Sequence, residues 1–248
     1  MLELRVALQM TEPIVVAMGG GGFSMEPENP LLDDHILGLA RAERARDRPR
    51  VCFLGTASGD APTYIASFYA AFARRAEASH LELFIRTVDD IDGFIAEQDV
   101  IYVGGGNTEN MLAIWRVHGV DHALRRAWQS GVVMAGLSAG SLCWFDTGTT
   151  DSFGKGLAAL SGGLGFIAGS YAPHYDGEPT RRPHYRRLVA EGILPAGYAA
   201  DDGVALVFRG TSLAEVVTAR PDARAYRVER GGADGDAIET VLPARYLG

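Results

Sequence analysis

Cysteine is scarce in this chain of 248 residues, which contains only Cys52 and Cys143. Each lies inside an apolar run of the kind that forms a protein core. A buried free thiol behaves as a small hydrophobic side chain. We therefore expect both cysteines to be reduced and buried, which indicates a reducing compartment.

Long apolar runs and positive charge are also lacking. No stretch approaches the roughly 18 consecutive apolar residues of a transmembrane helix, and the segment before Pro13 has one basic residue and no long apolar centre, unlike a secretory signal. The 31 acidic and 23 basic side chains give a net charge of −8, which argues against a nucleic-acid partner. We expect a cytoplasmic protein that binds neither nucleic acid nor membrane.

Complete nucleotide-binding patterns are missing from both glycine clusters, at residues 19–22 and 104–106. Neither fits the dinucleotide fingerprint, and the first lacks the Gly-Lys-Ser/Thr ending of a phosphate loop. The first cluster is typical of a strand end that passes close to a neighbour. The second precedes a helix start, where free backbone N–H groups can bind a transient oxyanion. We expect no cofactor.

Short apolar runs alternate with amphipathic stretches along the first half of the chain. This pattern predicts a mostly parallel sheet with helices on both faces, and the more regular alternation near the C-terminus predicts antiparallel strands. Composition and length fit one α/β domain over residues 1–248. The predicted strands are 14–18, 51–55, 81–85, 99–106 and 132–136, then 203–208, 213–219, 224–230 and 238–242; the predicted helices are 35–47, 63–78 and two that are capped by Thr108 and Asp121.

Ser138 lies in the sequence Gly-Leu-Ser-Ala-Gly, between an apolar run and a stretch with helical character. Strand, tight turn and helix in this order are typical of a nucleophile elbow, which presents a serine at the apex. The small neighbours permit the strained turn, and the N–H of Ala139 would point at an oxyanion. The alternative is a tight corner without catalytic function.

A serine nucleophile needs a base, usually histidine. His174 lies in a turn-rich loop that is stiffened by Pro173 and Pro179, which favours it over the other five histidines. His118 and His122 have the spacing of a metal-binding pair, but Gly119 breaks the helix between them and no further ligands are evident. We expect no metal.

The acid that would orient this histidine is not fixed by sequence physics, because a turn aspartate is usually a turn former. Asp151 is one candidate, 13 residues after the serine. The competing positions are Asp146, Asp176, Asp201 and Asp202.

Four ordered segments, VGGGNT, GLSAGS, TTDSFG and PHYDGE, resemble the peptidase E (aspartyl dipeptidase) family of serine peptidases, to which cyanophycinases are related. The resemblance covers about residues 14 to 230 and is nearest to the longer bacterial branch. It implies a fold similar to class I glutamine amidotransferases, whose elbow carries cysteine where this chain has Ser138. It also implies metal-independent cleavage of dipeptides that begin with aspartate.

The same resemblance implies a triad of Ser138, His174 and Asp151, with Asp202 as the alternative third member. The implied oxyanion hole is formed by the N–H groups of Gly105 or Gly106 and of Ala139. Residues expected to bind the substrate are Asn107, Arg181 and Arg182, since arginine binds carboxylates in a bidentate way.

We therefore expect a serine dipeptidase that forms an acyl-enzyme on Ser138, acts on a small peptide and is a monomer or homodimer. One alternative is a serine hydrolase of the same fold with another specificity, such as a cyanophycinase-like enzyme. Another is a catalytically silent binding protein.

Overall fold

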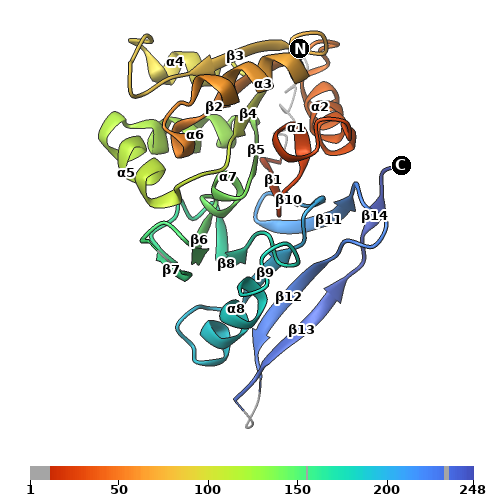
Figure 1. The fold of residues 1–248 in the computed structure, drawn as a ribbon. Coiled ribbons are helices and arrows are strands. Elements are labelled where there is room, and N and C mark those ends of the chain that lie inside the picture. The colour runs from red at the N-terminus through yellow and green to blue at the C-terminus, as the bar shows by residue number, and fades with distance from the viewer. Residues whose placement is uncertain (1–11, 155, 232–234) are drawn as a thin grey trace, which may run out of the picture.

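The computed structural model describes residues 12–154, 156–231 and 235–248, arranged as two β-sheets with surrounding helices (Figure 1). In chain order the strands are β1 (Ile14–Met18), β2 (Arg50–Leu54), β3 (Glu77–Leu81), β4 (Val100–Val103), β5 (Val133–Leu137), β6 (Phe145–Thr150), β7 (Ala158–Ser161), β8 (Ile167–Ala172), β9 (Gly197–Ala200), β10 (Val204–Arg209), β11 (Ser212–Thr218), β12 (Ala225–Arg230), β13 (Ala237–Leu242) and β14 (Arg245–Tyr246). The helices are α1 (Gly22–Met25), α2 (Leu31–Arg44), the 3-10 turn η1 (Thr56–Ser58), α3 (Pro62–Phe72), α4 (Ile91–Ala96), α5 (Thr108–His118), α6 (Val120–Gln129), α7 (Ala139–Leu142) and α8 (Arg181–Ala190).

The larger sheet has eight strands in the order β14-β11-β10-β1-β5-β4-β2-β3. Strands β1, β5, β4, β2 and β3 are parallel neighbours, so their C-terminal ends meet at one edge. Strand β10 joins β1 antiparallel, and β11 joins β10 in the same way. The predicted α/β fold with a parallel sheet and antiparallel strands towards the C-terminus is confirmed.

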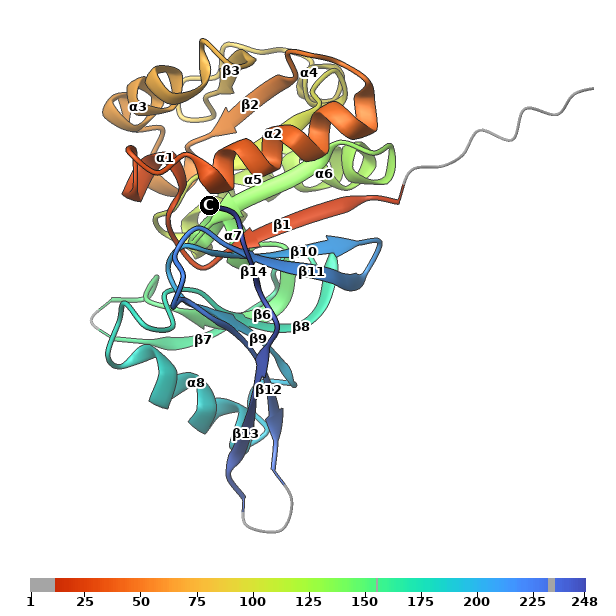
Figure 2. The same cartoon turned by 90° about the vertical axis from the view of Figure 1, so that its right-hand side faces the viewer.

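Helices cover both faces of the larger sheet, because its central strands are apolar on both sides. Along β1, Val15 and Ala17 pack into one core cluster, whereas Val16 and Met18 pack into the other. Helices α2 and α3 bury their apolar sides on the face of Val16, and α5 and α6 lie across the opposite face (Figure 2).

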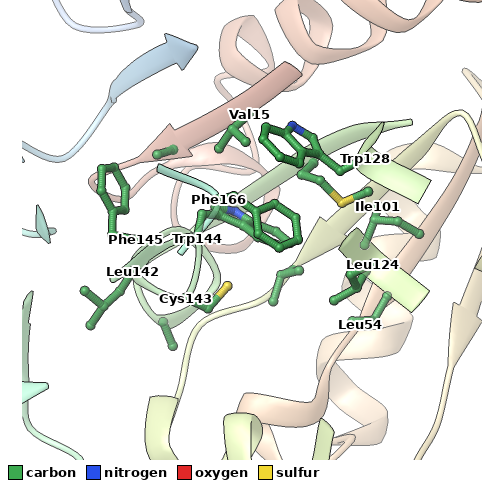
Figure 3. Packing of buried hydrophobic residues seen from close by; sticks show 14 of the residues in the cluster. Val15, Leu54, Ile101, Leu124, Trp128, Leu142, Cys143, Trp144, Phe145 and Phe166 are labelled. Carbon is green, nitrogen blue, oxygen red and sulfur yellow. The ribbon is translucent and has the colours of Figure 1, made fainter. Parts of the chain in front are cut away.

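The core on the α5 and α6 face is rich in aromatic side chains. Trp128 stacks on Phe166 with ring centroids 4.8 Å apart, and Trp144 lies 5.3 Å from Phe166 (Figure 3). Trp144 and the buried Cys143 follow the short helix α7 directly. This packing anchors the end of the segment that begins at Ser138.

The second sheet has six strands in the order β13-β12-β9-β8-β6-β7. It was not predicted as a separate sheet: the stretch after Ser138 was expected to be helical, but α7 has four residues and β6 begins at Phe145. The hairpin of β12 and β13 extends away from the larger sheet, and α8 packs against it (Figures 1 and 2).

Several local predictions differ from the structure. The helix expected at 35–47 is α2, which runs from Leu31 to Arg44, and Asp121 lies in the first turn of α6, whose N-cap is Gly119. The strand expected at 81–85 is β3, which ends at Leu81 because the next residues form turns, and the helix expected to 78 ends at Phe72. Helix α5 is capped by Asn107 rather than Thr108: the Asn107 side chain accepts a hydrogen bond from the Asn110 N–H.

Both cysteines are free and buried, as predicted, and burial raises the pKa of Cys52 to about 12. Among the described residues, no helix combines the length and the apolar character that crossing a membrane requires.

Candidate active site

Ser138 occupies a strained turn between β5 and α7. Its backbone dihedrals, φ 55° and ψ −119°, are unfavourable for a residue with a side chain and characterise an elbow that presents its apex. The flanking glycines are required by close packing: a Cβ on Gly136 would lie 2.2 Å from the Gly140 oxygen, and one on Gly140 would lie 2.2 Å from the Val103 oxygen. The sequence prediction of a strand, tight turn and helix is confirmed.

His174 lies at the same sheet edge as this turn. Strand β1 pairs with β5 in a register that sets Met18 beside Leu137, so Gly19 and Ser138 are the next residues on adjacent strands. The His174 N–H donates to the Gly19 oxygen at 3.2 Å, and His174 itself has a φ of 52°. The loop after β8 is therefore held against the strand next to the serine. No hydrogen bond joins Ser138 Oγ to His174 within the described part of the chain, and such contacts are often loose without substrate.

The imidazole of His174 is paired with Asp202, in the turn between β9 and β10. Nδ1 lies 2.6 Å from Asp202 Oδ1, and both side chains are largely buried. Burial alone would raise the pKa of Asp202, but the hydrogen bond and charge of His174, together with the charge of Arg220, outweigh burial and hold this pKa below its ordinary value. An ionised carboxylate here fixes the Nδ1–H tautomer and leaves Nε2 free to accept a proton.

Asp202 is fixed from several sides. Its N–H donates to Asp176 Oδ1 at 2.8 Å, and its segment forms a bridge with Gly20 at the end of β1. The neighbouring Asp201 is also buried; burial raises its pKa to about 6, and its side chain accepts a hydrogen bond from the Arg224 N–H. The backbone of Asp202 is thus fixed by the Asp176 side chain and by the bridge to Gly20, which positions its carboxylate against His174.

Asp151, the acid that the resemblance to the peptidase E family implies, lies elsewhere. It is exposed in the loop after β6, and no hydrogen bond from its side chain to His174 is found among the described residues. The loop is tied to the other side of the site, since the Ser152 oxygen accepts from Asn107 Nδ2. The expected pairing of His174 with Asp151 is therefore corrected to the alternative, Asp202, because β9 and β10 bring Asp202 to the end of β1.

The glycine loop after β4 lies beside the serine. A Cβ on Gly105 would lie 3.3 Å from the Cβ of Ser138. The Gly105 N–H is engaged, because it donates to the Tyr64 hydroxyl at 3.2 Å. For the N–H groups of Gly106 and Ala139, no hydrogen bond is found in the described parts of the chain. These two amides are therefore available as donors at this end of the sheet.

The three residues expected to bind substrate are all engaged with other protein groups. Asn107 caps α5 and donates to Ser152, as described above. Arg181 is buried and donates to the Thr149 oxygen at 3.0 Å and to Glu178 at 2.7 Å, although its Nε has no partner among the described residues. Arg182 pairs with Glu239, outside this sheet edge.

A cavity of about 360 Å³ opens beside the glycine loop, and sequence reasoning did not find it. It is lined by Ser24, Thr63, Tyr64, Ser67 and Gly105. Isolated serines and threonines in helices carry no signal of a site in the sequence. One feature of the sequence does indicate where Thr63 and Tyr64 lie. They directly follow Pro62 at the start of a helix that comes after a strand, which places them near the sheet edge.

One edge of the parallel sheet thus carries a strained serine, a histidine paired with a buried carboxylate, and two free amides. These groups are the parts of a serine hydrolase. The family comparison agrees with this class: the sequence model of Peptidase family S51 matches residues 15–216. The chain belongs to peptidase family S51.

Known proteins resemble the chain over almost its whole length. The uncharacterized peptidase YgaJ of Bacillus subtilis (strain 168) is 52% identical over 235 residues, which cover 94% of this chain and 99% of the relative. A peptidase from an acI-B1 actinobacterium has a similar fold, with a TM-score of 0.69 at 19% identity, covering 95% of this chain and 96% of the other. A candidate peptidase E from Listeria monocytogenes EGD-e has a TM-score of 0.58 at 16% identity, covering 94% and 100%. At these identities the two structures show the fold alone.

Proposed function

We propose that this peptidase is a serine-type dipeptidase that cleaves dipeptides with an N-terminal aspartate through an acyl-enzyme on Ser138. The observation that carries the mechanism is the 2.6 Å contact between His174 Nδ1 and Asp202 Oδ1, at the strand end next to Ser138. Family membership and the resemblance of the motifs to the aspartyl dipeptidases support the class of substrate.

The reaction begins when Ser138 Oγ attacks the peptide carbon while His174 Nε2 takes the hydroxyl proton. The N–H groups of Gly106 and Ala139 hold the oxyanion of the tetrahedral intermediate, and Asp202 stabilises the imidazolium. His174 then gives the proton to the leaving amine as the C–N bond breaks. Water then attacks the ester carbon and gives a proton to His174. As the bond between this carbon and Ser138 Oγ breaks, His174 returns the proton to Oγ, so that the acid leaves and the free enzyme is restored.

Asp202 acts in this scheme by orientation and charge. Because Asp202 holds Nδ1, the other ring nitrogen, Nε2, faces away from Asp202 and is the atom assigned to take the serine proton. Asp151 does not orient His174 in this proposal. Its exposed carboxylate lies in the loop that the hydrogen bond from Asn107 to the Ser152 oxygen holds near the glycine loop.

A substrate panel tests this function. Purified enzyme is given Asp-Leu, Leu-Leu and the β-linked aspartyl-arginine polymer cyanophycin, with Ser138→Ala as the blank. The proposal expects release of free amino acids from Asp-Leu only, and none by the variant. Cleavage of the polymer alone would assign the cyanophycinase-like alternative. Folded protein that cleaves no substrate and takes up no serine-directed fluorophosphonate would be a silent binding protein.

A further inference from the structure

His174 is held in a backbone conformation that its neighbours must maintain. Its φ of 52° is unfavourable for a residue with a side chain, and such a conformation persists only where surrounding contacts fix it. The His174 N–H donates to the Gly19 oxygen at 3.2 Å, and the N–H of the next residue, Tyr175, donates to the Ala200 oxygen at 3.1 Å. A force that moves the Tyr175 side chain therefore acts directly on the backbone of His174.

The phenol of Tyr175 reaches the C-terminal hairpin of β12 and β13. Its ring is buried and packs against Tyr185 and Tyr226, with ring centroids 6.1 Å and 5.3 Å apart. Its hydroxyl donates to Glu239 Oε1 on β13, a residue 64 positions further along the chain. Burial and this hydrogen bond raise the pKa of Tyr175, so the phenol remains a donor. The residue after the proposed base is thus attached to a distant strand.

Glu239 presents a largely buried carboxylate whose second oxygen is also engaged. Its side chain is 11% exposed, and Oε2 accepts from Arg182 Nη2 at 2.9 Å, with Arg186 Nε 3.8 Å away. The guanidinium of Arg182 also lies over the rings of Tyr175 and Tyr226, 5.5 Å and 4.9 Å from their centroids. The carboxylate therefore joins α8 and Tyr175 to one point on the hairpin.

Stability alone does not account for a carboxylate at this point. Strand β13 is the outer strand of the six-stranded sheet and pairs with β12. An apolar side chain commonly stabilises such a position as well as a buried ion pair does, whereas only the carboxylate fixes the direction of its partners. Among the described residues, the bond from Tyr175 to Glu239 is the only side-chain hydrogen bond between the His174 loop, residues 173–178, and the hairpin.

We propose that Glu239 is a positioning residue of this enzyme: by holding the Tyr175 hydroxyl, it sets the orientation of the His174 imidazole between Asp202 and Ser138. The proposal rests on the serine peptidase function above. Glu239 contacts neither the substrate nor the reacting atoms in this role, and its effect passes through Tyr175. Its loss should therefore slow the chemical step and leave substrate affinity unchanged.

Kinetics of three variants test this role. Glu239→Ala and Tyr175→Phe both remove the hydrogen bond. We expect kcat for Asp-Leu and the rate of fluorophosphonate labelling of Ser138 to fall about 10–10²-fold, because a displacement of about 1 Å has an effect of this order on catalysis. KM should stay nearly unchanged. Glu239→Gln keeps an oxygen that accepts from the Tyr175 hydroxyl, so it should restore most of the lost rate.

Glu229→Ala is the matched control for these measurements. The Glu229 carboxylate lies on β12 of the same hairpin, is about half exposed and pairs with Arg227, so this variant should keep the original kcat, KM and labelling rate. A rise in KM at unchanged kcat in Glu239→Ala would assign Glu239 to substrate binding and overturn the proposal. Original rates in both Glu239→Ala and Tyr175→Phe would overturn it too, as would equal losses in Glu239→Gln and Glu239→Ala.

A spectroscopic signature separates positioning from loss of the fold. The proton between His174 Nδ1 and Asp202 Oδ1 lies in a short charge-assisted hydrogen bond and should resonate far downfield in the proton NMR spectrum, with its absence in His174→Ala as the assignment. We expect Glu239→Ala and Tyr175→Phe to shift or broaden this resonance while the other resonances keep the dispersion of a folded protein. Glu229→Ala should leave it unchanged. A resonance unaffected by both Glu239→Ala and Tyr175→Phe would overturn the proposal.

The same measurements distinguish this proposal from the peptidase function. An original protein that cleaves no peptide and takes up no fluorophosphonate, but whose downfield proton responds to Glu239→Ala, would contradict the peptidase function and support the coupling of Glu239 to His174. Equal peptide cleavage by the original protein and by all three variants would support the peptidase function and overturn the positioning role.

Discussion

The Nδ1 atom of His174 lies 2.6 Å from Oδ1 of Asp202, although the two residues are 28 positions apart in the chain. The contact joins the loop after β8 to the turn between β9 and β10, and both segments lie against the end of β1. The pair is therefore held by the strand that lies next to the strand of Ser138. The chemistry proposed for this protein depends on that arrangement.

The first prediction separates the two candidate acids. Asp202→Asn removes the charge that fixes and stabilises the imidazolium, so the rate of fluorophosphonate labelling of Ser138 should fall about 10²–10⁴-fold. Asp151→Asn should keep its labelling rate within about tenfold of the original, because its side chain is exposed and makes no contact with His174. The measurement is the labelling rate by mass spectrometry, which does not depend on substrate binding.

Labelling rates that respond in the opposite order would contradict the assignment of Asp202. Circular dichroism of both variants serves as the control for folding, since Asp202 also receives a hydrogen bond from His174 in the core of the site.

A second prediction concerns the close approach of Gly20 to the same pair. A Cβ on Gly20 would lie 2.1 Å from Asp202 Oδ1 and 2.9 Å from His174 Nδ1, distances that side-chain atoms do not tolerate. Gly20→Ala should displace Asp202 and lower kcat by at least about 10²-fold, because it separates a catalytic base from its orienting acid.

Gly38→Ala provides the matched control for this experiment. Gly38 lies within α2, and a Cβ there meets no atom within 4 Å. The variant should keep full activity and unfold at a slightly higher temperature, because alanine is favoured over glycine in a helix by about 1 kcal/mol. Full activity in Gly20→Ala would show that the pair is not needed in the observed geometry.

The third prediction concerns pH and the buried Asp33 at the start of α2. Burial raises its pKa from 3.8 to about 6, although the Tyr102 hydroxyl donates to it at 2.9 Å. The folded state favours the protonated form of Asp33. The contribution of this acid to the free energy of unfolding is therefore complete below about pH 3.8 and is lost as the pH rises through about 6. Ionisation at pH 7 costs about 3 kcal/mol by this shift.

Asp33→Asn removes this cost, so its free energy of unfolding should rise relative to the original protein between pH 4 and pH 8, as measured by urea titration. In Tyr102→Phe the hydroxyl that stabilises the carboxylate is missing, so the pKa of Asp33 rises further, and the loss of stability should extend to higher pH and become larger. A difference between Asp33→Asn and the original protein that is constant with pH would contradict this account.

Most of the fold was predictable because its strands are buried on both faces. The apolar runs that form β1 and β5 each end in a Gly-rich turn. This pattern is typical of a parallel sheet that keeps its ligands at one edge. The second sheet was less predictable. Strands such as β6, with the sequence FDTGTT, carry neither a long apolar run nor a clear alternation.

The candidate site was predictable where local sequence determines geometry. The turn at Ser138 requires small residues on both sides, so its pattern is visible in the chain. The partner of His174 depends instead on which of several turn aspartates the sheet brings to the end of β1. Asp202 and Asp151 both lie in polar turns, and only the antiparallel addition of β10 to β1 distinguishes them.

The central claim is that Ser138 is the activated nucleophile of this site. The most direct measurement is peptide mapping by mass spectrometry after reaction with a fluorophosphonate, in the original protein and in His174→Ala. The account predicts a single adduct on Ser138 and its loss in His174→Ala. An adduct on another serine, or an unlabelled Ser138 in folded protein that still cleaves peptides, would contradict it.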